Sequence, residues 1–138
     1  MGGDHGCAVV IGGVKLALQA DPRITSLLLV GQEDKIRPAL AATGLNDRRT
    51  QIVHASEVLT MDDSPVEGIR RKKDSSMVRA IDLVRDGKAD AVISPGNTGA
   101  LVAGSMKLRR LEGVERPAIT VRMPSRSGDF VLLDAGAN

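Results

Sequence analysis

Two segments of this chain combine residue types that bind phosphate-like anions. Residues 70–76 place four consecutive cations, Arg-Arg-Lys-Lys, before an aspartate and two serines, and such donors are common ligands of phosphate oxygens. Residues 94–100, Ser-Pro-Gly-Asn-Thr-Gly-Ala, form a glycine-rich loop between a predicted buried strand and a predicted helix. Because backbone N–H groups at a helix N-terminus attract anions, the two segments together predict a site for a phosphate-like ligand.

The cation run has two interpretations. If it is helical, successive side chains step by about 100° around the axis, so the four cannot share one solvated face. At least one should then point toward a neighbouring element, a cleft or a partner. The alternative is an exposed helix end, with Ser75 or Ser76 capping the next helix. The adjacent hydroxyls favour the anion site, although they could cap as well.

The glycine-rich loop is also open to two interpretations. Gly96 and Gly99 allow a backbone to approach a ligand closely, while Asn97 and Thr98 add side-chain donors. The alternative is a tight turn capped by Asn97 or Thr98. The loop is neither a Walker loop nor a dinucleotide-binding fingerprint, because it lacks the Lys-Ser/Thr pair and the glycine spacing of those motifs.

Two further loops carry polar residues at the ends of predicted elements. Residues 1–6, Met-Gly-Gly-Asp-His-Gly, open the first predicted helix, and residues 134–138, Asp-Ala-Gly-Ala-Asn, follow the last predicted strand. The four loops could converge on one cleft. A surface position for His5 and a buried helical position for Cys7 are favoured over a Cys–His nucleophile. No spacing of His, Cys and carboxylates fits a metal site.

The apolar pattern predicts the elements that position these loops. Strands are predicted where apolar runs are continuous, at 27–30, 91–93 and 131–133, with weaker candidates at 52–53 and 118–121. Helices are predicted at about 9–18, at 34–43, from a cap at Asp74 or Ser75 to Gly87, and from Asn97 to about Arg109. This alternation predicts an α/β fold, a three-layer α/β/α sandwich with a mainly parallel sheet.

The composition narrows the class of protein. The chain has 138 residues, 42% of them hydrophobic, and a net charge of +2, which fits one globular domain in which charge acts by clustering. With Phe130 as its single aromatic residue, the chain offers almost no surface on which bases could stack, so no nucleic-acid partner is predicted. The single cysteine, Cys7, excludes an internal disulfide and fits a reducing cytoplasm.

Five motifs in order resemble the PlsX family, the bacterial phosphate acyltransferases of phospholipid synthesis. They are Met1-Gly-Gly-Asp4, Met61-Asp-Asp-Ser-Pro65, Arg71-Lys-Lys-Asp-Ser-Ser-Met77, Gly96-Asn-Thr-Gly-Ala100 and Asp134-Ala-Gly-Ala-Asn138. Pro95 stands where the family usually has Ala, and Ala135 where it usually has Val. The match runs from end to end. Residues 1–138 resemble the N-terminal part of that family's single catalytic domain, and we expect the first strand and the C-terminal part to be absent.

The resemblance implies transfer of a fatty acyl group from acyl carrier protein to inorganic phosphate, giving an acyl phosphate, without a cofactor. It also implies an isopropylmalate-dehydrogenase-like fold, a homodimer, and a cytoplasmic enzyme that can associate peripherally with the membrane or contact a glycerol-phosphate acyltransferase. Arg70 or Arg109-Arg110 could dock the acidic carrier protein. Asn97 and Thr98 are then the expected catalytic residues. The expected phosphate-binding and cleft residues are Gly2, Gly3, Asp4, Arg71, Lys72, Lys73, Ser75, Ser76, Gly96, Gly99, Asp134 and Asn138.

Two alternatives to this function stay open. One is a phosphotransacetylase-like enzyme that uses a coenzyme A thioester, and the other is a non-catalytic anion-binding fragment. The acyl donor discriminates between the two enzymes, and the absence of turnover identifies the fragment.

Overall fold

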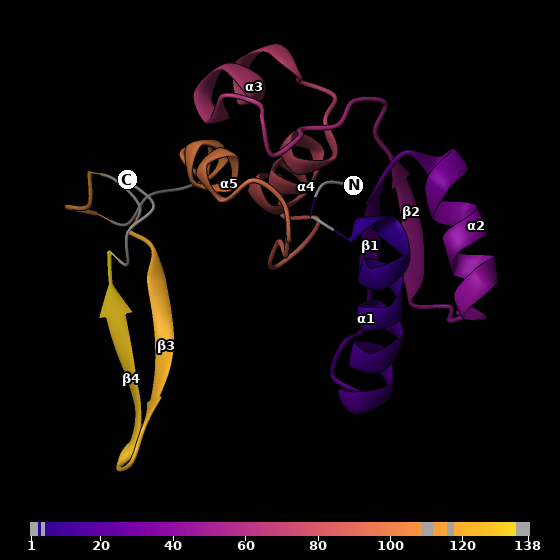
Figure 1. The fold of residues 1–138 in the computed structure, drawn as a ribbon, viewed down its shortest axis with the longest axis horizontal. Coiled ribbons are helices and arrows are strands. Elements are labelled where there is room, and N and C mark those ends of the chain that lie inside the picture. The colour runs from indigo at the N-terminus through magenta and orange to yellow at the C-terminus, as the bar shows by residue number, and fades with distance from the viewer. Residues whose placement is uncertain (1–2, 4, 109–111, 116–117, 135–138) are drawn as a thin grey trace.

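The computed structural model describes residues 3, 5–108, 112–115 and 118–134. Helices and short strands make up this part of the chain, in an order that Figure 1 follows from the N-terminus to the C-terminus. The elements are α1 (Gly6–Ala20), β1 (Leu27–Gly31), α2 (Glu33–Thr43), β2 (Thr50–His54), α3 (Pro65–Arg71), α4 (Ser76–Arg85), α5 (Thr98–Ser105), β3 (Thr120–Ser125) and β4 (Gly128–Leu133).

A small parallel sheet lies in the N-terminal half. β1 and β2 pair in parallel, with Leu27 opposite Thr50 and Gly31 opposite His54, and α2 is the crossover that parallel strands require. The buried residues Ile11, Leu29 and Ile36 join α1, β1 and α2 in one core cluster. The continuous apolar sequence of β1 therefore reflects packing against helices rather than an exposed face.

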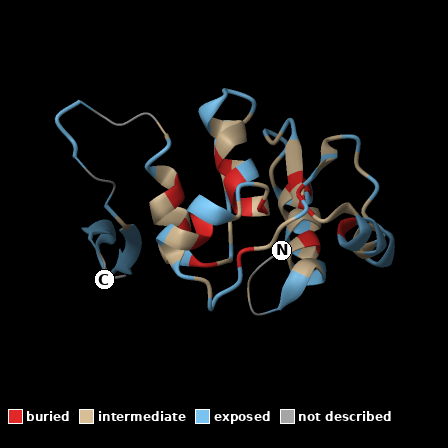
Figure 2. Ribbon diagram, turned by 90° about the horizontal axis from the view of Figure 1, so that it is seen from above, coloured by how far each residue is buried: buried red, intermediate tan, exposed pale blue. Residues whose placement is uncertain are grey.

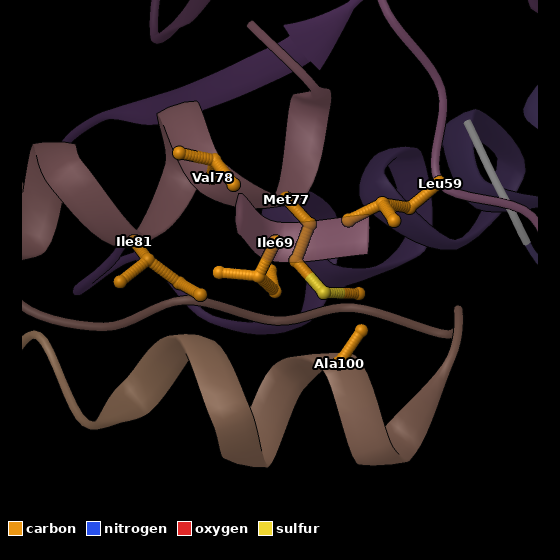
Figure 3. Packing of buried hydrophobic residues seen from close by; sticks show 6 residues of the cluster. All are labelled: Leu59, Ile69, Met77, Val78, Ile81 and Ala100. Carbon is orange, nitrogen blue, oxygen red and sulfur yellow. The ribbon is translucent and has the colours of Figure 1, made fainter. Parts of the chain in front are cut away.

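A second core cluster holds α3, α4 and α5 together. Its buried side chains are Leu59, Ile69, Met77, Val78, Ile81 and Ala100. Figure 3 shows these six, with the Ala100 side chain of α5 directed toward Met77 of α4. Gly104 brings α5 so close to α4 that a Cβ atom there would collide with the Ile81 side chain. The apolar face of α4 and the small residues of α5 thus allow close helix packing.

β3 and β4 form an antiparallel hairpin in which Met123 lies opposite Phe130 and Val121 opposite Leu132. These four apolar residues share one face, because directly opposite residues of an antiparallel pair point to the same side. Arg122 and Asp129 form an ion pair of 2.6 Å. Every residue of both strands is exposed, and the hairpin is uniformly pale blue in Figure 2.

The structure confirms a small parallel sheet with helices and corrects two strand predictions. The predicted strands at 27–30 and 52–53 are β1 and part of β2, whereas 131–133 lies in the antiparallel hairpin and not in the parallel sheet. Residues 91–93 form no strand, and Ile93 is 96% exposed. A strand needs a neighbour to accept and donate its backbone hydrogen bonds, and within the described ranges no segment pairs with 91–93.

The helix predictions are confirmed with one change of length. α4 begins after Ser75 and is followed by Asp86 and Gly87, the latter at a φ of 69°. α5 begins after Asn97 but ends at Ser105, because the chain turns at Met106 and the Lys107 N–H bonds to the Gly104 carbonyl. Among the helices that the structure describes, none is long and apolar enough to cross a membrane.

Candidate functional site

Asn97 lies at the centre of the glycine-rich loop and is 7% exposed. Its side-chain oxygen accepts a hydrogen bond of 2.9 Å from the Ala100 N–H, which caps α5. Its amide group donates to the carbonyls of Thr60, Met61 and Asp63, at 3.4, 3.3 and 3.1 Å. The side chain predicted to be catalytic is thus fully hydrogen-bonded within the protein.

Lys72 is the member of the cation run that points inward. Its ammonium donates to an Asp63 carboxylate oxygen at 2.6 Å and to the Val58 carbonyl at 3.0 Å, and 33% of its side chain is exposed. This confirms that at least one cation of the run faces a neighbouring element. Arg70 and Arg71 are exposed and pair with Glu67 one turn earlier on α3, at 3.4 and 3.1 Å.

Asp63 collects donors from two segments on one oxygen. Besides Lys72, the Thr60 N–H at 2.7 Å and the Thr60 hydroxyl at 3.0 Å donate to it. The Lys72 hydrogen bond, followed by those from Thr60, lowers the pKa of the Asp63 carboxyl from 3.8 to about 2. Asp63 is therefore a fixed negative charge that neutralises Lys72.

The second half of the cation segment is tied to the end of β2. Ser75 is fully buried, and its hydroxyl caps α4 by accepting from the Val78 N–H at 3.4 Å. The Ser56 hydroxyl and N–H both donate to the Asp74 carboxylate, as does Arg79. These bonds, with that of the Ser56 hydroxyl the largest cause, lower the pKa of Asp74.

The segment 55–63 joins the two predicted anion-binding segments. At one end Glu57 forms a parallel bridge with Ser75, and the Ser76 N–H donates to the Glu57 carbonyl at 3.2 Å. At the other end the carbonyls at 60, 61 and 63 hold Asn97. The cation run and the glycine-rich loop, more than twenty residues apart in sequence, therefore contact the same short segment.

Two glycines bring backbone segments of the site close together. A Cβ atom on Gly99 would lie 2.8 Å from Pro65 Cγ, so the first turn of α5 packs tightly on the start of α3. Gly3 has a φ of +102°, and a Cβ atom there would lie 3.1 Å from the Pro95 carbonyl oxygen. Gly3 thus lies against Pro95 of the glycine-rich loop, which brings together parts of two of the four loops.

Three predicted ligands keep their side-chain donors available. Lys73 is exposed, Ser76 is half-buried at the start of α4, and Thr98 is exposed at the start of α5. Within the described part of the chain, no hydrogen bond or ion pair uses these three side chains. The N–H groups of Thr98 and Gly99 also have no acceptor there, since the Asn97 cap binds the N–H of Ala100. These groups can bind an anion without breaking the fold.

The remaining predicted residues fall into two sets. The Gly96 N–H donates to the Ser94 hydroxyl at 3.2 Å, which shapes the loop, and Asp134 follows β4 of the hairpin at a φ of 53°. Gly2, Asp4 and Asn138 lie outside the described residues, as do Arg109 and Arg110. His5 is exposed at the start of α1, and Cys7 packs against the cluster of Ile11, Leu29 and Ile36.

A hollow of about 440 Å³ opens beside Lys73. Lys73, Asp74, Arg79 and Asp86 are among its lining residues, and no residue of the 94–99 loop lines it. Its walls are of mixed charge. The hollow therefore adjoins the cation run only and does not connect it to the glycine-rich loop.

Sequence reasoning assigned no function to Asp63, which connects the parts of this junction. The motif at residues 61–65 stands out in the sequence, but nothing in it separates Asp63 from Asp62. The available signal was the spacing: Thr60 and Asp63 lie three residues apart just before Ser64-Pro65, where side chains commonly bond to nearby backbone groups.

Comparison with known proteins gives one family for the whole chain. Residues 1–138 match the model of a family described as fatty acid synthesis protein. Proteins named phosphate acyltransferase from Exiguobacterium sp. (strain ATCC BAA-1283 / AT1b), Legionella pneumophila (strain Paris) and Akkermansia muciniphila are 48%, 48% and 45% identical to it. The alignments cover 100% of this chain and 42%, 41% and 40% of those relatives. The chain thus spans about two-fifths of the length of the curated relatives it matches.

Proposed function

The chain belongs to the fatty acid synthesis protein family, and from this premise we propose that the full-length protein transfers a fatty acyl group from acyl carrier protein to inorganic phosphate. The observation that supports the proposal most is the identity of 45–48% to proteins named phosphate acyltransferase along the whole of this chain. The hydrogen-bond donors left available by the fold suit the phosphate half of that reaction.

In the proposed reaction a phosphate oxygen attacks the thioester carbonyl carbon directly. The carbon–sulfur bond then breaks, the carrier protein leaves as a thiolate that takes up a proton, and the product is an acyl phosphate. No covalent acyl-enzyme is needed, so Cys7 has no function in this scheme. Holding the two reactants in contact supplies much of the rate enhancement of such a transfer.

The available donors divide between the two reactants. Lys73 and the Ser76 hydroxyl bind phosphate, with Arg71 on the outer rim. Thr98 and the N–H groups of Thr98 and Gly99 stabilise the oxyanion that develops on the thioester, an interaction worth about 3 kcal/mol per donor in other enzymes. Asn97 positions this turn rather than meeting the oxyanion itself, since its amide is bound to three carbonyls.

The remaining assignments concern the whole protein. In this proposal the cleft is lined by Gly2, Gly3, Asp4, Gly96, Asp134 and Asn138. Lys72 and Ser75 stabilise the cleft without contacting phosphate. The full-length protein is proposed to complete a three-layer, isopropylmalate-dehydrogenase-like sandwich and to act as a cytoplasmic homodimer. Contact with the membrane surface or with a glycerol-phosphate acyltransferase would deliver the product.

The test is an assay of the full-length protein with a long-chain acyl carrier protein and phosphate. We expect release of free carrier protein and formation of acyl phosphate, trapped as a hydroxamate. Turnover of the coenzyme A thioester alone would favour the phosphotransacetylase-like enzyme instead. Phosphate binding without turnover of either thioester would identify a non-catalytic anion-binding protein.

A variant at Lys73 tests the phosphate assignment. Lys73→Ala should raise the KM for phosphate about tenfold, because an exposed ammonium without a carboxylate partner is removed from the site. Lys35→Ala is the matched control, since Lys35 is exposed on the distant helix α2. Equal phosphate KM values for the two variants would remove Lys73 from the site.

A further inference from the structure

Asp63 is the residue through which the two donor-rich segments are connected. Its carboxylate binds Lys72 of the cation run, while its backbone carbonyl accepts from Asn97 in the glycine-rich loop. Within the described residues, no other residue is bonded to both of these side chains.

The carboxylate end of this connection accepts three hydrogen bonds. One oxygen of Asp63 accepts from the Thr60 N–H, the Thr60 hydroxyl and the Lys72 ammonium, at 2.7, 3.0 and 2.6 Å. Only 23% of the Asp63 side chain is exposed. Three donors converging on one partly buried carboxylate fix the conformation of the 60–63 turn, unlike an exposed ion pair, which contributes little.

The conformation of this turn sets the position of α5. The carbonyls of Thr60, Met61 and Asp63 point at the Asn97 amide only while the turn keeps its shape. Asn97 in turn caps α5, and Gly99 packs directly on Pro65. A change of the 60–63 turn is therefore transmitted to the N–H groups of Thr98 and Gly99.

We propose that Asp63 is a positioning residue. It holds the cation run and the first turn of α5 in the geometry that binds phosphate and stabilises the oxyanion of the thioester. The inference rests on the proposed function for the identity of the anion. Asp63 touches no substrate in this proposal, since a carboxylate would repel phosphate. It acts through Lys72, whose charge it neutralises, and through Asn97.

The opposite assignment makes an opposite prediction. If Lys72 were itself a phosphate ligand, Asp63 would compete with phosphate for the ammonium, and Asp63→Asn would tighten phosphate binding. If Asp63 positions the site, the same variant should weaken phosphate binding, because the turn that holds the two donor-rich segments loses its shape. The sign of the change therefore separates the two assignments.

The experiment compares Asp63→Asn with Asp62→Asn in the full-length protein. Asp62 is the adjacent, exposed aspartate and is a matched control. We expect Asp63→Asn to lower kcat about tenfold, because the N–H groups of Thr98 and Gly99 that stabilise the oxyanion are displaced, and to raise the KM for phosphate. Asp62→Asn should match wild type. A phosphate KM for Asp63→Asn that equals or falls below the wild-type value would overturn the inference.

A second measurement needs neither turnover nor phosphate. Hydrogen exchange of the Ala100 amide, which Asn97 caps, should become faster in Asp63→Asn than in Asp62→Asn. Unchanged exchange at Ala100 would overturn the positioning role whatever the ligand is. If Ala100 exchanges faster while wild type turns over no acyl carrier protein, the positioning role stands and only the proposed function fails.

Lys72→Met covers the case in which Asp63→Asn does not fold. This variant removes the same ion pair from the other side, and Ala100 exchange should again become faster. Unchanged exchange in Lys72→Met would show that the pair does not control the turn, and would overturn the inference.

Discussion

The α3–α5 cluster and the β3–β4 hairpin contain similar apolar side chains, which are buried in the cluster and exposed in the hairpin. In the cluster Ile81 and Ala100 are fully buried, whereas in the hairpin Phe130 and Leu132 are 49% and 47% exposed. In the cluster, three helices pack around one set of buried side chains. The hairpin has two strands, and no third strand pairs with them among the described residues. Apolar sequence therefore does not make a core unless a second layer covers it.

The same contrast separates the polar groups of the two regions. Asp63 and Lys72, beside the cluster, are 23% and 33% exposed, and each has a further hydrogen bond, with Thr60 and with the Val58 carbonyl. Arg122 and Asp129 of the hairpin are 78% and 43% exposed. Figure 1 shows the hairpin standing apart from the helices. The candidate site is thus built on the region with a packed core, where side chains can be held in fixed positions.

The largest expected effect is the loss of a core side chain in the cluster. Ile81→Ala should lower the free energy of unfolding by about 2–5 kcal/mol, because it leaves a cavity between α4 and α5. The same substitution at Ile93, which is 96% exposed, is the matched control and should change stability by less than about 0.5 kcal/mol. Urea unfolding measures both. Similar losses at the two positions would mean that Ile93 is covered in solution.

A smaller effect is expected from the polar junction in acid. Because the pKa of Asp63 is lowered from 3.8 to about 2 in the folded protein, its ionised form favours folding. This contribution is complete above pH 3.8 and is lost as the pH falls to about 2. Unfolding free energy measured against pH should therefore fall less steeply in Asp63→Asn than in wild type.

Asp129→Asn provides the control for the acid experiment, since it removes a carboxylate from the exposed hairpin pair. Suppose that the unfolding free energy of Asp63→Asn fell as steeply as that of wild type between about pH 4 and about pH 2. The Asp63–Lys72 pair would then stabilise the fold no more than the exposed Arg122–Asp129 pair. The contrast between the two regions would then hold for apolar groups only.

The smallest effect is expected in the hairpin. Phe130→Ala should lower the free energy of unfolding by less than about 1 kcal/mol, the usual size of a cross-strand interaction such as that with Met123. Urea unfolding and hydrogen exchange of the β3 and β4 amides measure the change. A decrease as large as that of Ile81→Ala would break the comparison, because it would require a covered apolar face.

The sequence predicts an element well where the residues of that element alone determine its structure. The sequence offers Asp74 or Ser75, and Asn97 or Thr98, as helix caps, and Ser75 and Asn97 are the caps in the structure. The apolar run at 27–30 predicts a strand of a parallel sheet, which β1 confirms. The run at 91–93 has the same appearance and is not a strand in the structure. The difference lies in the neighbour that each run has, and a neighbour is a property of the tertiary structure rather than of the run.

The candidate site was predictable as a pair of segments but not as a set of hydrogen bonds. The cation run and the glycine-rich loop were identified from donor-rich residues, yet a donor does not reveal its acceptor. Lys72 and Asn97 bind protein oxygens of the 55–63 segment, whereas Lys73 and Thr98 keep their donors available. Asp63 was missed because its importance comes from two partners that are distant in sequence.

The close approach of Gly3 to Pro95 bears on the order in which the chain folds. Joining these residues closes a loop of roughly ninety residues, which costs more chain entropy than closing any single helix turn or the β1–β2 crossover. We therefore expect the N-terminal loop to dock after both core clusters have formed, and to separate first in a partial opening of the fold. The contact of Gly3 with the glycine-rich loop would then be the last part of the candidate site to form during folding.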